Sequence, residues 1–217
     1  MLFTKAFLIT RKGRHTSLFW LPTTGNGIFG DMAVSAKKIV GKVSAFHTLL
    51  QEQVRNELTA AQQYIAVAVW FDKGDLPQLA RHFYRQSLEE RNHAMMIVRY
   101  LMDVGIDVTI PGVDEVRNDF TEAAEVVALA LQQERDVADE VNALVRAARE
   151  ENDYTGEQFM QWFLAEQVEE IAQMSTLLNV IKRGKGNLFD VENFLAREGA
   201  SGAGTDAAAP RAAGGAL

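Results

Sequence analysis

Cysteine is absent from the 217-residue chain, and proline occurs only four times. The lack of cysteine excludes a disulfide framework, thiolate-bound zinc or iron–sulfur clusters, and a cysteine nucleophile. It is also compatible with a cytoplasmic protein, which is the location we expect. The scarcity of proline leaves the central part of the chain free to form long, uninterrupted helices.

Long hydrophobic runs are missing as well. No stretch of 18 or more consecutive apolar residues occurs, so the sequence predicts no membrane-spanning helix. Near the N-terminus, the apolar run from Ala6 to Ile9 is too short for a secretory signal and is followed by Arg11, Lys12 and Arg14. We therefore expect no membrane partner.

Positive charge is scarce over most of the chain. Residues 1–42 contain seven Lys and Arg and one Asp, whereas residues 43–217 contain 15 Lys and Arg and 28 Asp and Glu. The longer segment is therefore strongly acidic. An acidic body repels nucleic acid and attracts cations, so the composition predicts no nucleic-acid partner.

A helical period is present between residues 44 and 198. Apolar side chains recur there every three to four residues, which is typical of amphipathic helices. The predicted helices are four long ones and a short fifth, at residues 44–73, 75–104, 121–151, 154–182 and 187–197. Ser44, Asp75 and Thr121 are the expected residues at the first three helix starts. With one long connection at residues 105–120, the pattern predicts an all-α four-helix bundle with a single long crossover.

The two ends of the chain lack this period. Residues 1–43 mix aromatic, basic and Gly, Pro or Thr residues, and we expect a disordered extension that adds no metal chemistry. A start at Met32 is one alternative for this segment, and a basic binding arm is another. Residues 199–217 are rich in Gly and Ala and have no core to build, so we expect a disordered tail.

One spacing pattern occurs twice on the predicted helices. In each copy, a glutamate precedes an i, i+3 pair of polar residues by 33 and 36 positions. The copies are Glu57 with Glu90 and His93, and Glu134 with Gln167 and Glu170. Carboxylate-bridged di-metal sites in four-helix bundles need one Glu from each of two helices and an i, i+3 pair from each of the others. The second copy has Gln and Glu where the first has Glu and His, so the predicted site is asymmetric.

These six residues interrupt the apolar stripes near the middle of their helices. Antiparallel packing would therefore bring them to one level of the bundle. They could be ordinary surface acids, but six phased residues with matched spacings argue against that. A buried carboxylate costs several kcal/mol unless its charge is paired, and few Lys or Arg share these stripes. Metal cations would supply the missing charge.

Four carboxylates and one imidazole favour iron or manganese over copper, with zinc as a competitor. Glu90 is central and is the predicted bridge between two ions. Glu57, Glu90 and His93 would form the stronger first site. Glu134, Glu170 and the Glu90 bridge would form the second, with Gln167 as a weak ligand or as a group that contacts a ligand.

Four further residues lie beside these predicted ligands. Tyr64 follows Glu57 by two helical turns on the same face, and is either a core tyrosine or a redox-active phenol beside the metals. Glu89, Glu166 and Glu169 are each adjacent in sequence to a ligand and point about 100° away from it. They are either solvated acids or ligands of a third, outward-facing iron site.

The segments that carry these residues resemble bacterial non-haem ferritins, and are most similar to the mycobacterial type. They are Asn56–Tyr64, Glu89–Met96, Phe159–Phe163 and Glu166–Glu170. The resemblance covers about residues 44–198, and Ala212–Gly215 in the tail is similar as well. It implies a ferritin-like bundle in a hollow homo-oligomeric cage of 24 subunits, whose fifth helices line the four-fold axes.

The resemblance also implies an activity. Such a protein stores iron: it oxidises Fe(II) with dioxygen at a di-iron ferroxidase centre and keeps the Fe(III) as mineral, without haem. The implied centre consists of Glu57, Glu90, His93, Glu134, Gln167 and Glu170, with Tyr64 beside it and Glu89, Glu166 and Glu169 at the third iron site. The tail would be dispensable for cage formation, and its docking onto an encapsulating shell is a further partner hypothesis.

Three alternatives remain. A bacterioferritin-like di-iron oxidase, haem-free or haem-binding, has a histidine where this chain has Glu170 and a haem-ligating methionine where it has Arg91. A rubrerythrin-like peroxidase would need a cysteine-bound iron domain. A metal-free structural bundle is disfavoured by the acids predicted to lie inside it.

Overall fold

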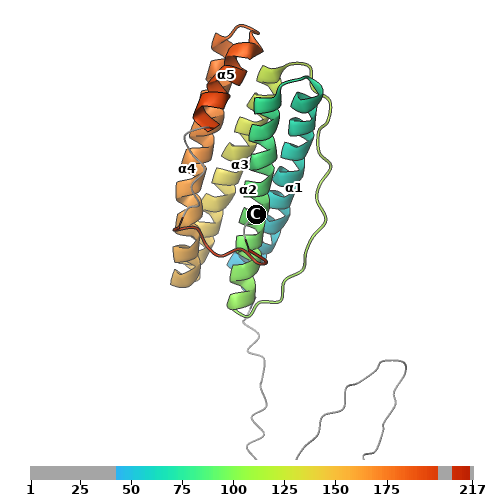
Figure 1. Ribbon diagram of the computed structural model, residues 1–217. Coiled ribbons are helices and arrows are strands. Elements are labelled where there is room, and N and C mark those ends of the chain that lie inside the picture. Colours follow the sequence, from blue (N-terminus) through green and yellow to red (C-terminus); the bar gives the residue numbers. More distant parts are fainter. Residues whose placement is uncertain (1–42, 200–206, 216–217) are drawn as a thin grey trace, which may run out of the picture. The chain divides into compact units, whose positions relative to one another are not determined.

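The computed structural model describes residues 43–199 and 207–215, and its helices confirm the predicted architecture (Figure 1). The described part of the chain contains no strand and five helices: α1 (Ala45–Lys73), α2 (Pro77–Asp103), α3 (Ala123–Glu150), α4 (Tyr154–Arg183) and α5 (Leu188–Gly199). The four long helices lie side by side and α5 is short. The protein is therefore an all-α four-helix bundle with a fifth helix. None of the helices in residues 43–199 combines the length and the hydropathy that a membrane span requires.

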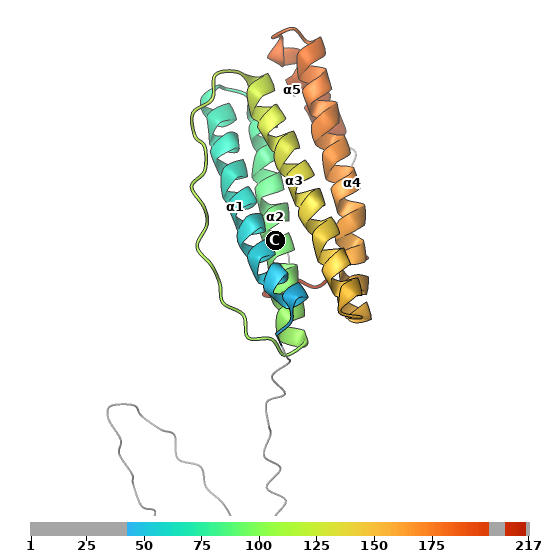
Figure 2. The same ribbon diagram turned by 180° about the vertical axis from the view of Figure 1, so that it is seen from behind.

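The topology places the middles of all four long helices at one level. α1 packs antiparallel to α2, α3 packs antiparallel to α4, and α1 also contacts α3. The long crossover between α2 and α3 runs along α1 (Figure 2). Hydrogen bonds hold it there: Gln63 Nε2 donates to Arg117 O at 2.8 Å, and Asp114 N donates to Thr59 Oγ1 at 3.1 Å.

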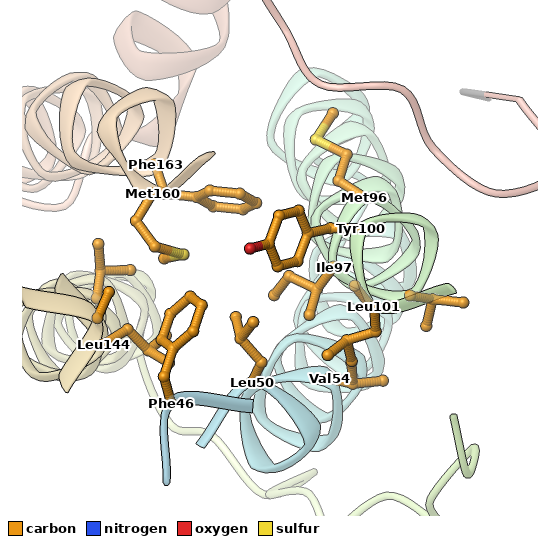
Figure 3. Packing of buried hydrophobic residues seen from close by; sticks show 14 of the residues in the cluster. Phe46, Leu50, Val54, Met96, Ile97, Tyr100, Leu101, Leu144, Met160 and Phe163 are labelled. Atoms are coloured by element: carbon orange, nitrogen blue, oxygen red, sulfur yellow. The ribbon is translucent and has the colours of Figure 1, made fainter. Parts of the chain in front are cut away.

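Two apolar clusters fill the interior of the bundle. In the first cluster, Met160 and Phe163 of α4 face Tyr100 of α2 and Phe46 of α1 (Figure 3). The second cluster includes Tyr64, Phe71, Leu79, Phe83, Val127 and Met174. The buried charged and amide side chains lie on the same helices between these two sets of residues, so the bundle has a polar layer between two apolar ones.

One glycine fixes how closely α4 approaches α1. A Cβ atom at Gly156, in the first turn of α4, would lie 2.3 Å from Cε1 of Phe46. Real atoms do not approach that closely, so any larger residue would push the Phe46 ring out of the core. Gly156 N donates to Asp153 Oδ1 at 2.8 Å, and this hydrogen bond caps α4.

Helix starts agree with the sequence in one case and differ in two. Ser44 caps α1, because its side chain accepts from His47 N. The prediction that Asp75 caps α2 was wrong: Asp75 has φ 57° and the helix begins after Leu76. Carboxylate oxygens of Glu192, on α5, instead accept from Gln78 N at 2.8 Å and from Leu79 N at 2.9 Å. A cap from a distant helix replaces the local one that the sequence predicted.

The start of α3 also differs from the prediction. Thr121 was expected to open this helix, but α3 begins at Ala123 and no side chain caps it at Glu122. Thr121 lies one residue further out, where its N and Oγ1 both donate to Glu125 Oε2. Glu125, in the first turn of α3, therefore accepts hydrogen bonds from the preceding loop. A negative charge at this position is favourable because the N-terminus is the positive end of the helix dipole.

The structure describes residues 207–215 of the tail that was predicted to be disordered. Residues 207–215 form turns in which Ala213 N donates to Met95 O of α2 at 2.9 Å. Ala209, Ala212 and Ala213 pack against the first apolar cluster. The small alanine side chains allow the backbone of residues 207–215 to approach α2 closely. The amino-acid composition of the tail does not predict this contact. The predicted extension at residues 1–43 lies almost entirely outside the described residues.

Candidate metal centre

The six predicted ligands lie in the polar layer, one or two from each long helix. Each is at most 5% exposed, although four of the six are carboxylates and one is an imidazole. The helical register explains the burial, since Glu57 falls between the buried Val54 and Ala61 on the apolar stripe of α1. The same register places the other ligands inward on α2, α3 and α4.

The first half of the layer is formed by α1 and α2. One ligand atom from each of Glu57, Glu90 and His93 lies within 4.8 Å of the other two. His93 Nδ1 is 3.1 Å from Glu90 Oε2. Gln53 Nε2 donates to Glu57 Oε1 at 3.0 Å. Two carboxylates and an imidazole thus converge on one point, as in a metal site with oxygen and nitrogen ligands.

The second half is formed by α3 and α4 and shares Glu90 with the first. Ligand atoms of Glu90, Glu134 and Glu170 also lie within 4.8 Å of one another. Tyr64 OH donates to Glu134 Oε1, and Gln167 Nε2 donates to Glu170 Oε2. Because Glu90 belongs to both groups, it occupies the place of a carboxylate that bridges two ions.

Several buried oxygens in this layer have no hydrogen-bond partner. They are Glu57 Oε2, Glu90 Oε1, Glu134 Oε2, Gln167 Oε1 and Glu170 Oε1. An unpaired buried acceptor costs roughly 1–3 kcal/mol, and more when it is charged. Five such acceptors around one space are what a site for hard cations requires, so the residues present fit a pair of iron ions.

Burial and mutual repulsion change the proton affinity of the carboxylates. Burial raises the pKa of Glu57 to about 7, with the charges of Glu134 and Glu140 adding to the effect. Burial, followed by repulsion from neighbouring acids, raises the pKa of Glu90 and Glu170 well above the usual value. Metal binding to these side chains would therefore displace protons.

His93 behaves in the opposite way. Burial lowers its pKa to about 4, so the imidazole is neutral at physiological pH and its lone pair is available to a metal. Its ring lies edge-to-face against Trp162 and Phe163 of α4, with centroids 5.5 and 5.9 Å away. These rings restrict the orientation of the imidazole and keep that side of the centre apolar.

Glu89, Glu166 and Glu169 are the predicted ligands of a third iron site. Within the described residues, no group of close ligand atoms combines Glu89, Glu166 and Glu169. Glu166 instead lies within 4.8 Å of His93 and Glu170. Glu169 is exposed, and Glu89 accepts a hydrogen bond from Gln86. The outer site therefore remains a prediction.

Two buried glutamines were missed by the sequence analysis. Gln53 and Gln86 precede Glu57 and Glu90 by four residues each, and both are at most 2% exposed. The signal was present, because the two glutamines are themselves 33 residues apart, which is the spacing of the predicted ligands. Neutral amides were overlooked because only metal-ligating residue types were counted.

A four-helix bundle with one long crossover and an inward-facing set of Glu and His on all four helices defines the class of carboxylate-bridged di-metal bundle proteins. The comparison with protein families is more specific. Residues 47–184 match the model of the Ferritin family, which describes a ferritin-like domain. The chain belongs to the ferritin family.

Similar proteins support this assignment. The chain is 60% identical over 172 residues to Ferritin BfrB of Mycolicibacterium smegmatis, covering 79% of this chain and 94% of that one. It is 58% identical over 177 residues to Ferritin BfrB of Mycobacterium tuberculosis, covering 82% and 97%. The structure matches an open pore ferritin of Archaeoglobus fulgidus with a TM-score of 0.67 at 25% identity, covering 70% and 94%. The resemblance to bacterial non-haem ferritin is thereby confirmed.

Proposed function

We propose that this iron-storage protein oxidises Fe(II) with dioxygen at the polar layer and holds the product as ferric mineral inside a cage of 24 copies. The observation that carries the proposal is the shared position of Glu90 in two groups of buried, close ligand atoms. We further propose that the cage is cytoplasmic and binds no haem.

Each pair of Fe(II) ions supplies two electrons, one from each ion. Dioxygen accepts these two electrons and two protons to become hydrogen peroxide. Iron is therefore the substrate, and the protein must collect two ions within reach of one dioxygen molecule. A single bridging carboxylate is a direct way to hold two like-charged ions at that separation.

The roles of the residues follow from their geometry. Glu57 and His93 would hold the ion in the first half, and Glu134 and Glu170 the ion in the second, with Glu90 between them. Carboxylates suit Fe(III) at least as well as Fe(II), because a harder ion prefers oxygen ligands. The carboxylates that give up protons on metal binding lie beside the place where dioxygen needs protons.

Tyr64 and Gln167 support the second half of the centre. Both donate a hydrogen bond to a carboxylate oxygen, which leaves the other oxygen of that carboxylate unpaired and free for a metal. Burial, followed by the charge of Glu134, raises the pKa of Tyr64 well above its usual value. The phenol therefore keeps its proton and acts as a hydrogen-bond donor rather than as an anionic ligand.

The variant Glu90→Ala tests the proposal. It removes the bridge, and we expect the initial rate of Fe(II) oxidation to fall by about 100-fold or more, the upper end of what loss of a supporting group costs a metal site. The measurement is ferric absorbance after aerobic addition of two Fe(II) per subunit to metal-free protein. Light scattering after size exclusion should still give the mass of the wild-type particle.

Ser87→Ala is the matched control. Ser87 is a buried polar residue of α2 one turn before Glu90, but it donates to Tyr84 O and belongs to no ligand group. It should oxidise iron at the wild-type rate. If the assembled Glu90→Ala particle oxidises Fe(II) at the wild-type rate, Glu90 does not act as a bridging ligand in the reaction. A stoichiometric Soret band in protein from haem-sufficient cells would reinstate the bacterioferritin-like alternative.

A further inference from the structure

The side chain of Gln53 is buried in the first half of the polar layer without being a metal-ligand type. It is 2% exposed, and its Nε2 donates to Glu57 Oε1 at 3.0 Å. The other oxygen of that carboxylate, Oε2, is buried and has no partner. The two oxygens of Glu57 are therefore unlike: one is held by a neutral amide and the other is free.

Helical geometry makes this contact possible. Gln53 and Glu57 are four residues apart on α1, so their side chains lie on the same face of the helix. Both point into the layer where Glu57, Glu90 and His93 bring ligand atoms within 4.8 Å of one another. Burying a primary amide costs free energy unless the amide is hydrogen-bonded. The hydrogen bond from Gln53 to Glu57 is therefore favoured in the folded protein.

We propose that Gln53 is a positioning residue that fixes Glu57 as a ligand through one oxygen, with Oε1 occupied by the amide and Oε2 presented to the metal. The inference rests on the proposed function, because it concerns the same centre. It assigns to Gln53 a role in metal affinity and coordination number, and not in the chemistry of oxidation itself.

The choice of a neutral donor has a physical reason. A Lys or Arg in this position would also fix the carboxylate, but its charge would neutralise Glu57 and repel an incoming cation. An amide fixes the orientation and adds no charge. Partners that orient a ligand in this way typically contribute about 10–100-fold to metal affinity.

The chain contains an internal comparison. Gln86 holds the equivalent position on α2, four residues before Glu90, and is 1% exposed. Its Nε2 donates to Glu89, however, and not to Glu90. Two glutamines with the same spacing and the same burial thus differ in one respect: only Gln53 contacts a residue of the two groups that share Glu90.

The experiment compares Gln53→Met with Gln86→Met. Methionine is unbranched and has a similar length, so each variant removes the amide with little change in shape. Metal-free assembled particles are titrated with Co(II), and its visible absorption bands are recorded. We expect Gln53→Met to weaken binding of the first Co(II) per subunit by about 10-fold or more. The bands should also lose intensity, because a carboxylate bound through both oxygens raises the coordination number.

Gln86→Met should bind the first Co(II) with wild-type affinity and band shape, while losing as much thermal stability as Gln53→Met. Gln53→Asn is a second variant that keeps an amide but shortens its reach, and it should weaken Co(II) binding in the same direction. Equal weakening in the two methionine variants, or unchanged binding in Gln53→Met and Gln53→Asn, would overturn the inference alone. If the wild-type particle binds no Co(II), the proposed function itself is overturned, and the inference with it.

Discussion

The two halves of the polar layer have the same spacing in the sequence but different chemistry. The α1–α2 half contains an imidazole that is neutral at physiological pH, because burial lowers the pKa of His93 to about 4. The α3–α4 half has only acids and an amide, and both Glu134 and Glu170 have raised pKa values, chiefly through burial. Burial therefore favours the protonated form of both acids in the second half, so metal binding there competes with protons at each of them.

This difference bears on how iron is handled. A symmetric site with a histidine in each half would retain both ions as a permanent cofactor. A site with one strong and one weak half suits ions that are substrates, because the product must leave before the next pair enters. The predictions below test whether the halves differ in this way.

The largest expected effect is the dependence of metal-free stability on pH. Glu57 has a folded-state pKa of about 7 against an ordinary value of 4.5. An acid whose pKa is raised by folding holds its proton longer in the native state, so stability falls as pH rises from about 4.5 to 7. At about 1.4 kcal/mol per pKa unit, this residue alone removes about 3 kcal/mol.

Chemical denaturation of metal-free protein at pH 5 and pH 8 measures this loss. Glu57→Gln should reduce the loss of stability between pH 5 and pH 8 by the part that Glu57 contributes. Saturating metal should restore the stability of the wild type at pH 8. Equal stability of the metal-free wild type at both pH values would mean that the first half accommodates its charge without a cation.

The next largest effect should come from removing one ligand from each half. We expect His93→Ala to weaken the tighter Co(II) site by about 100-fold, because the imidazole is the only ligand there that binds without losing a proton. Gln167→Ala should weaken only the looser site, by a few-fold, since a neutral amide is a weak ligand. Comparable losses in the two variants would remove the distinction between the halves.

A smaller effect is expected from making the halves alike. Glu170→His restores the residue type found in the first i, i+3 pair, and we expect the second Co(II) to bind about 10-fold more tightly. The same variant should release its ferric product more slowly in repeated cycles of Fe(II) addition. A second site that is unchanged or weaker would show that the shape of the pocket, and not the ligand type, sets the difference.

The smallest effect should come from deleting residues 200–217. Ala213 N donates to Met95 O of α2, two residues beyond His93, so the described part of the tail is hydrogen-bonded to the helix that carries two of the predicted ligands. Loss of this hydrogen bond costs about 1 kcal/mol. We expect an unchanged particle mass by light scattering, a slightly lower melting temperature, and faster Co(II) exchange in the first half only. If the truncated chain yields only dimers, the tail is part of the assembly interface.

The sequence predicted those features that depend on register along one helix. The period of the apolar residues located the helices. The i, i+3 spacing placed Glu90 and His93 on one face of α2, because a regular helix converts spacing into direction. The features that it did not predict depend on contacts between distant elements. Glu192 caps α2 across more than a hundred residues, and nothing local to Asp75 indicates this.

The outer carboxylates show the same limit. Glu89 and Glu166 were grouped because each is next to a ligand in the sequence. In the structure Glu89 is engaged by Gln86, and Glu166 turns towards His93 and Glu170. Side-chain rotamers decide which neighbours meet, and spacing alone does not specify them.

The cap that Glu192 provides has a consequence for protein engineering. The helix that it caps, α2, also carries Glu90, the proposed bridge, so the fifth helix cannot be exchanged without affecting that helix. A peptide fused beyond residue 217 leaves the cap in place. A design that replaces α5 exposes the N–H groups of Gln78 and Leu79, at a cost of about 1 kcal/mol. Cargo attached to this protein therefore belongs after the tail, where it leaves the helix of the metal centre undisturbed.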